Sequence, residues 1–127
     1  MGYLYILAGA LIGAPARYFV QSQVQEATGA LFPIGTLVVN ASGCLVIGLL
    51  AGISEEYGVL TRDQRMFLFI GVLGSYTTFS SFGLDSVQLL REGQALQAWL
   101  NVTASVTLGL AAVWAGLLVV QWVSSRG

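Results

Sequence analysis

The chain has 127 residues, of which 56% are hydrophobic and only 9% are charged, and its mean hydropathy is +0.79. An average soluble domain carries about 25% charged residues, so these figures exclude a soluble monomer and a disordered chain and predict an integral membrane protein. The net charge of −1 leaves no basic surface for nucleic acid, and the lack of histidine with a single cysteine, Cys44, excludes His-based triads, most zinc sites and an intramolecular disulfide.

Four segments are predicted to cross the lipid bilayer. Charged residues are confined to a few positions, which leaves uncharged runs at 27–54, 66–84 and 93–125. About 20 apolar residues cross a bilayer as a helix, and a helix is the only open-ended structure that satisfies the backbone there. We therefore predict an all-α membrane protein with one transmembrane domain over 1–127. The predicted spans are 3–25, 33–54, 64–91 and 95–123.

The first span carries a pair of glycines and one arginine. Gly9 and Gly13 form a GxxxG motif, which lets helices approach closely in lipid. Packing within the chain is the simpler interpretation of such a motif. Arg17 follows Pro15 in the outer part of the span, where it could reach lipid headgroups or a vestibule. No positive region precedes the apolar stretch, so we do not expect a cleaved signal peptide.

The second span contains a polar residue at membrane depth. Asn40 has two amide donors and one acceptor, and these groups need partners in dry surroundings. One interpretation is a structural hydrogen bond to another helix. The other is a donor that faces a path for an anion or water. Gly48 and Gly52 form a second GxxxG motif in this span.

The third span has the strongest local signal, at 71–83. Three glycines and five Ser or Thr residues lie in this uncharged stretch, and such residues weaken a helix or compete for its backbone bonds. We therefore expect a break within 74–79, with a continuous helix as the alternative. Irregular backbone at this depth is tolerated only inside protein or beside a cavity. Its free carbonyls could hold a cation, and its free N–H groups an anion.

Two phenylalanines and an acid follow this expected break. Phe79 and Phe82 share a face if the helix resumes there. Apolar core is the default interpretation, but ring edges carry partial positive charge and could line an anion path. Asp85 lies just beyond the pair and could either carry protons or be hydrated near the end of the span.

The fourth span has a polar face and an aromatic residue at each end. Asn101 and Ser105 are four residues apart, so they share a helical face and are candidates to line a polar path. Trp99 and Trp122 bracket the span, and the helix between them covers roughly 35 Å. This spacing fits an aromatic residue at each membrane interface.

The charge distribution gives only a weak orientation. Four spans place both termini on the side of the 55–65 loop, which carries Arg62 and Arg65 and is joined by Arg126. Arg91 lies on the other side, so the bias is small under the positive-inside rule. A single topology and dual insertion with antiparallel pairing both stay open. Four helices barely surround a polar path, so we expect an oligomer, most simply a dimer.

Three ordered stretches of this sequence resemble the Fluc (CrcB) family of fluoride channels. They are GALIGAPARY at 9–18, GTLVVN at 35–40, and 71–82 with its TTFSSF core. The resemblance implies a dual-topology antiparallel homodimer with a broken third helix and two fluoride pores, in the cell inner (plasma) membrane. The pore-lining residues would be Asn40, Phe79, Ser80, Ser81, Phe82, Asn101 and Ser105.

The resemblance also implies a vestibule residue and a bound ion. Arg17 would lie near the vestibule, and a structural sodium ion at the dimer centre would be held by the backbone carbonyls of Gly74 and Thr77. Two positions depart from the family pattern. Gly109 stands where the polar track of the fourth span would have a hydroxyl, and Ser81 stands where Thr is frequent.

We therefore predict a passive channel, not an enzyme, that exports cytoplasmic fluoride and gives fluoride resistance. Uncharged donors suit a small hydrated anion because they do not trap it, but the choice of fluoride comes from the resemblance. The main alternative is a four-helix proton-coupled multidrug exporter, which needs a carboxylate in its first helix; here no acid precedes Glu26. A membrane assembly subunit is a second alternative, but it leaves Asn40 without a purpose.

Overall fold

The computed structural model describes all residues 1–127, and every regular element in it is a helix. Four segments are long and apolar enough to cross a membrane, as the sequence predicts. The shortest has 24 residues and covers about 36 Å, which exceeds the roughly 30 Å of hydrocarbon in a bilayer. The four segments are Gly2–Thr28, Ile34–Tyr57, Arg62–Arg91 and Ala95–Ser124.

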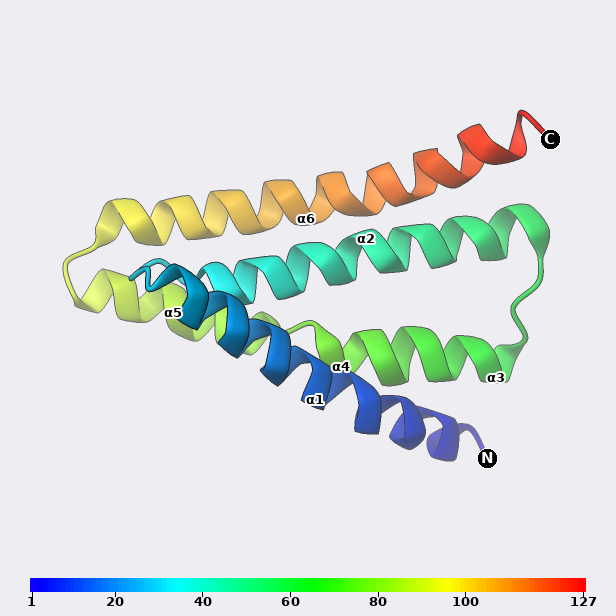
Figure 1. Cartoon of the computed structure of the whole chain (residues 1–127), viewed down its shortest axis with the longest axis horizontal. Helices are drawn as coiled ribbons and strands as arrows, with labels where there is room; N and C mark the ends of the chain where they lie inside the picture. The colour runs from blue at the N-terminus through cyan, green and yellow to red at the C-terminus, as the bar shows by residue number, and fades with distance from the viewer.

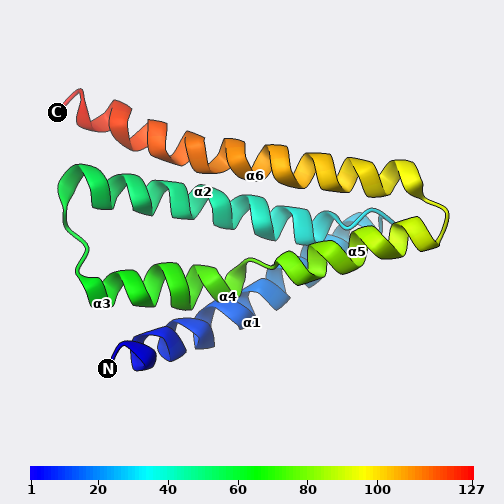
Figure 2. The same ribbon diagram turned by 180° about the vertical axis from the view of Figure 1, so that it is seen from behind.

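Three of these segments are single helices. They are α1 (Gly2–Thr28), α2 (Ile34–Tyr57) and α6 (Ala95–Ser124). Helices α2 and α6 run side by side along the long axis, and α1 crosses the third segment obliquely (Figure 1). Both chain termini lie at the same end of the molecule as the α2–α3 connection, as the view from behind also shows (Figure 2). This arrangement is the one expected for an even number of crossings.

The third segment is divided into several elements. It begins at a capping box, in which the Thr61 hydroxyl accepts the N–H of Gln64 and the Gln64 side chain accepts the N–H of Thr61. A π-helical stretch follows, a feature that often marks functional sites and that the sequence did not predict. The elements are α3 (Arg62–Arg65), η1 (Met66–Leu73), α4 (Gly74–Tyr76) and α5 (Phe79–Arg91).

Both GxxxG motifs pack helices within the chain. A Cβ atom on Gly9 would lie 2.7 Å from the Cα of Gly71, so α1 and η1 touch through their backbones. A Cβ atom on Gly48 would lie 3.0 Å from the Cα of Val113, where α2 meets α6. The simpler interpretation of these motifs is therefore confirmed, and neither is left free to join a second chain.

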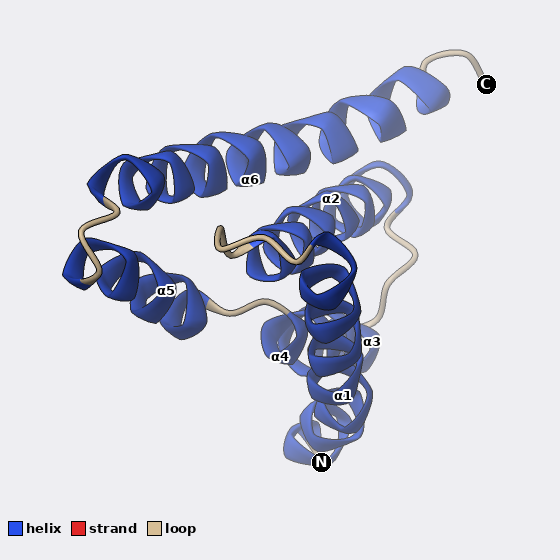
Figure 3. Ribbon diagram, turned by 60° about the vertical axis from the view of Figure 1, so that its left-hand side comes forward, coloured by secondary structure: helices blue, strands red, loops and turns tan.

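Helix α5 has few buried residues for its length. It packs mainly against α6 and only lightly against α2. Among its residues only Ser86 and Leu89 are buried. Figure 3 shows α5 below α6, joined to α4 by the short link at Thr77 and Thr78. Specific contacts must therefore hold α5 in place, since an extensive apolar core does not.

Candidate functional site

The backbone between α4 and α5 is extended at two residues. Thr77 has φ −81° and ψ 156°, and Thr78 has φ −147° and ψ 115°. The Thr77 hydroxyl donates to the Leu73 carbonyl at 3.0 Å, and the Thr78 hydroxyl accepts the N–H of Ser81 at 3.2 Å, which caps α5. The Thr77 hydroxyl thus bonds the turn before the link, and the Thr78 hydroxyl bonds the turn after it. Both take backbone partners that a continuous helix would use.

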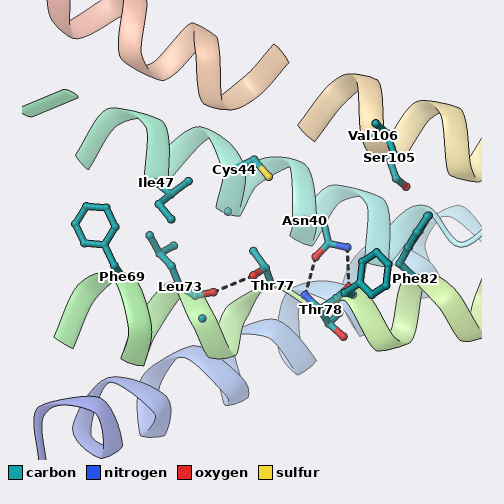
Figure 4. Close-up of a pocket in the computed structure, with 13 residues that line it drawn as sticks. Asn40, Cys44, Ile47, Phe69, Leu73, Thr77, Thr78, Phe82, Ser105 and Val106 are labelled. Carbon is teal, nitrogen blue, oxygen red and sulfur yellow. Dashed lines mark hydrogen bonds between the residues drawn. The ribbon is translucent and has the colours of Figure 1, made fainter. Parts of the chain in front are cut away.

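The side-chain amide of Asn40 is bonded to this link. Its Nδ2 donates to the Thr78 carbonyl at 3.0 Å, and its Oδ1 accepts the Thr78 N–H at 2.8 Å (Figure 4). Thr78 is only 7% exposed, so its backbone groups would otherwise be buried without partners. The structural hydrogen bond that the sequence left open for Asn40 is therefore present. One amide hydrogen of Asn40 remains beyond this pair.

A cavity of about 330 Å³ lies beside the link, between α2, η1, α5 and α6. No charged side chain lines it, and apolar residues such as Phe69, Leu73 and Val106 form much of its wall. The structure therefore gathers several of the expected site residues around one uncharged space. Those residues are Asn40, Gly74, Thr77, Phe79, Phe82 and Ser105.

The two phenylalanines form a tilted pair at the edge of this cavity. Their ring centroids are 5.6 Å apart, and their planes are inclined by 52°. Phe82 is half-buried, whereas Phe79 is 83% exposed. Within the chain, therefore, Phe82 is part of the packed structure and Phe79 presents its ring to the surroundings.

Asn101 lies outside the cavity, in the contact between α6 and α5. It is 1% exposed, and its Nδ2 donates to the Ser86 hydroxyl at 3.0 Å. Its Oδ1 accepts the Ser105 hydroxyl at 3.4 Å. Of the two polar candidates on α6, Ser105 faces the cavity and Asn101 faces α5.

The remaining expected site residues do not line the cavity. Ser80 is exposed and Ser81 is half-buried, and their hydroxyls lie 3.4 and 3.1 Å from the hydroxyl of Thr78. Both serines therefore belong to the cap of α5. Arg17 is half-buried on α1.

A second polar cluster joins three helices and was missed by sequence reasoning. The Thr36 hydroxyl accepts from Gln21 Nε2 at 3.1 Å and donates to Asp85 Oδ2 at 2.9 Å. These residues line a cavity of about 450 Å³ near the α1–α2 connection, together with Gln25 and Glu26. The sequence did contain a signal for this cluster. Thr36 lies one helical turn before Asn40, so the two polar residues share one face of α2.

Four helical segments that are long and apolar enough to cross a membrane define a multi-pass membrane protein, and an uncharged, mostly apolar cavity lies beside its irregular link. The sequence profile of the family described as "CrcB-like protein, Camphor Resistance (CrcB)" matches residues 4–117. The chain belongs to this family.

Curated relatives cover almost the whole chain. A protein of Solibacter usitatus is 45% identical over 121 residues, which are 95% of this chain and 99% of that protein. A protein of Rhodospirillum rubrum is 44% identical over 118 residues, which are 91% of this chain and 92% of that protein. A protein of Methylocella silvestris is 40% identical over 121 residues, which are 94% of this chain and 92% of that protein. Each is named fluoride-specific ion channel FluC.

Proposed function

We propose that this protein is a fluoride-specific ion channel, through which cytoplasmic fluoride leaves the cell down its gradient, with fluoride resistance as the result. Relatives of that name match more than nine tenths of the chain. The structural observation that carries the proposal is the uncharged cavity where Asn40 holds the extended link beside the Phe79 and Phe82 rings. Donors without full charge can replace water around an anion without trapping it.

The cavity has several weak donors for an anion. Asn40 keeps one amide hydrogen after bonding Thr78. The edges of the Phe79 and Phe82 rings carry partial positive charge. Helix α5 begins at Phe79, so the positive end of its dipole also lies beside the cavity. Since no arginine lines this space, a bound anion would remain free to move on.

We further propose that the working unit is a homodimer with two pores. The outer side of the link is uncovered in one chain, since Gly74 and Ser80 are exposed and Phe79 is 83% exposed. Irregular backbone at membrane depth is tolerated inside protein or beside a cavity, but not against lipid. A second copy packed on this face would cover it and bring a second phenylalanine pair to each cavity.

An antiparallel arrangement is the proposed form of this dimer. Dual insertion is compatible with the weak bias of positive charge, because Arg62, Arg65 and Arg126 at one end are opposed by Arg91 at the other, joined by Arg17 if its side chain reaches outward. The proposed location is the cell inner membrane. Arg17 would then lie at a vestibule that leads to the cavity.

The third segments of two such chains could share a structural sodium ion, held by the carbonyls of Gly74 and Thr77. The donor set fits this ion. The N–H of Thr78, which a continuous helix would direct to Gly74, is bonded to Asn40. No hydrogen bond outside the regular helices ends on the carbonyl of Gly74 or Thr77. Such free carbonyls at membrane depth can coordinate Na⁺, and the ion would link the two chains at the link segment.

A proton-coupled multidrug exporter is not favoured. Helix α1 has no acid before Glu26, which lies in its last turn. The one acid in the interior of α5, Asp85, accepts a hydrogen bond from Thr36. The first helix therefore lacks the membrane-embedded carboxylate that such an exporter needs.

Fluoride efflux from liposomes tests the proposal. Purified protein is reconstituted into vesicles loaded with KF, and external fluoride is followed with an electrode. We expect rapid efflux only after valinomycin lets potassium leave, because an electrogenic channel otherwise stops at a small membrane voltage. Vesicles without protein, and vesicles loaded with KCl, are the controls. Folded protein that releases no fluoride, or that releases chloride equally well, would refute a fluoride-specific channel.

A further inference from the structure

Helix α5 meets α6 along one stripe that includes a phenylalanine of the proposed pore. Phe82, Ser86 and Leu89 are spaced i, i+4 and i+7, so they share one face. Ser86 is 8% exposed and Leu89 is 4% exposed, and α5 has no other buried residue. The direction of the Phe82 ring is therefore coupled to how Ser86 docks on α6.

A short chain of hydrogen bonds determines that docking. The Ser86 hydroxyl donates to the Phe82 carbonyl at 2.8 Å, so its only proton is used. It can then only accept from α6, and Asn101 meets it with the donor Nδ2 at 3.0 Å. The Ser105 hydroxyl donates to Asn101 Oδ1 at 3.4 Å. The Asn101 amide therefore has its nitrogen toward an acceptor and its oxygen toward a donor.

We infer that Asn101 is a positioning residue that acts through Ser86 to hold α5, and with it the Phe82 ring, against the cavity. This role differs from contact with the ion. Asn101 is 1% exposed and is absent from the cavity wall, to which α6 contributes Ser105 and Val106. The inference rests on the proposed channel function for its consequence, but the placement of Phe82 can be measured without any flux.

Ser86 makes the inference testable, because it lies outside the cavity and touches no proposed ion path. The experiment compares Ser86→Ala, Asn101→Leu and the double variant in the liposome assay. We expect each single variant to lower fluoride efflux at least tenfold, and the double variant to lower it no further, because both changes break one contact. Thr103→Val is the matched control, since Thr103 is exposed on the opposite side of α6.

A spectroscopic readout follows the ring itself. We expect 4-fluorophenylalanine incorporated at position 82 to show a shifted or divided ¹⁹F resonance in both single variants and an unchanged one in Thr103→Val. If Asn101→Leu abolished efflux while Ser86→Ala had normal efflux and an unchanged resonance, Asn101 would act on the ion and the inference would be wrong. Normal efflux in both single variants would overturn it as well.

Two further measurements distinguish a failure of the positioning role from a loss of folding and from a failure of the proposed channel function. Ser86→Ala leaves the buried amide of Asn101 without an acceptor and could unfold the protein. The double variant removes both partners, so its folded state and its ¹⁹F resonance still decide the question. If the unmodified protein released no fluoride, the proposed function would fail, whereas a shifted resonance in Ser86→Ala and Asn101→Leu would still support the positioning role.

Discussion

Removal of the Asn40 amide is expected to destabilise the link between α4 and α5. Asn40→Ala takes away two hydrogen bonds, at 2.8 and 3.0 Å, and leaves both backbone groups of Thr78 without partners. A single side-chain hydrogen bond in a membrane protein contributes about 0.6–1.7 kcal/mol to the free energy of unfolding, so the loss of two such bonds lowers it by about 1–3 kcal/mol. If the N–H and the carbonyl of Thr78 both stay buried and unpaired, the upper limit of this destabilisation is about 6 kcal/mol. Because Thr78 is 7% exposed, we expect about 2–4 kcal/mol.

Reversible unfolding in mixed micelles with increasing SDS measures this loss, with tryptophan fluorescence as the signal. Ser42→Ala is the matched control, since Ser42 lies on the same helix and bonds the Tyr76 hydroxyl across the interface at 2.9 Å. Its removal leaves no backbone group unpaired, so we expect a loss below about 1 kcal/mol. Hydrogen exchange at the Thr78 amide should accelerate in Asn40→Ala alone. A loss within 0.5 kcal/mol of the control, with unchanged exchange at Thr78, would refute the reasoning.

Other predictions concern the proposed pore, the proposed sodium site and the helix packing. Phe79→Ile and Phe82→Ile should each abolish fluoride efflux while the protein still elutes in size exclusion as the unmodified protein does; normal efflux in both would contradict the proposed pore assignment. Replacement of sodium by a larger organic cation during purification should weaken dimer stability or efflux, and indifference would count against the carbonyl site. Gly116→Ala should cost more than about 3 kcal/mol, because its Cβ would lie 2.6 Å from the Leu49 nitrogen. Gly109→Ala on the same helix has only an ordinary contact at 3.5 Å and should change stability by less than about 1 kcal/mol.

The sequence was sufficient for the four helices because their signal is local. Charged residues are absent from long runs, and a bilayer requires helices of a known length, so each span follows from composition alone. The expected ends agree with the structure to within about three residues, for example 33–54 against Ile34–Tyr57. The stretch 74–79 was singled out by its local chemistry, and Thr77 and Thr78 within it have extended backbone angles.

The partners of the polar residues were not predictable in the same way. Which atom Asn40 bonds depends on how α2 lies beside a link 38 residues further along the chain. The burial of Asn101 likewise depends on where α5 docks, and that contact involves Ser86, which carries no distinctive sequence signal. The π-helical turns of η1 also escaped prediction, because their residues are ordinary apolar side chains.

The two interpretations that the sequence left open for Asn40 are compatible in one residue. A primary amide has two N–H groups and one carbonyl oxygen, and the Thr78 backbone uses one N–H and the oxygen. The remaining N–H is held in a known direction by the other two bonds, so it loses little further freedom when it meets an anion. A charged side chain at this position would bind the anion more tightly but could not pair with both backbone groups of Thr78. The amide would therefore suit the proposed conducting site, because it pairs with both backbone groups of the link and would hold the ion weakly.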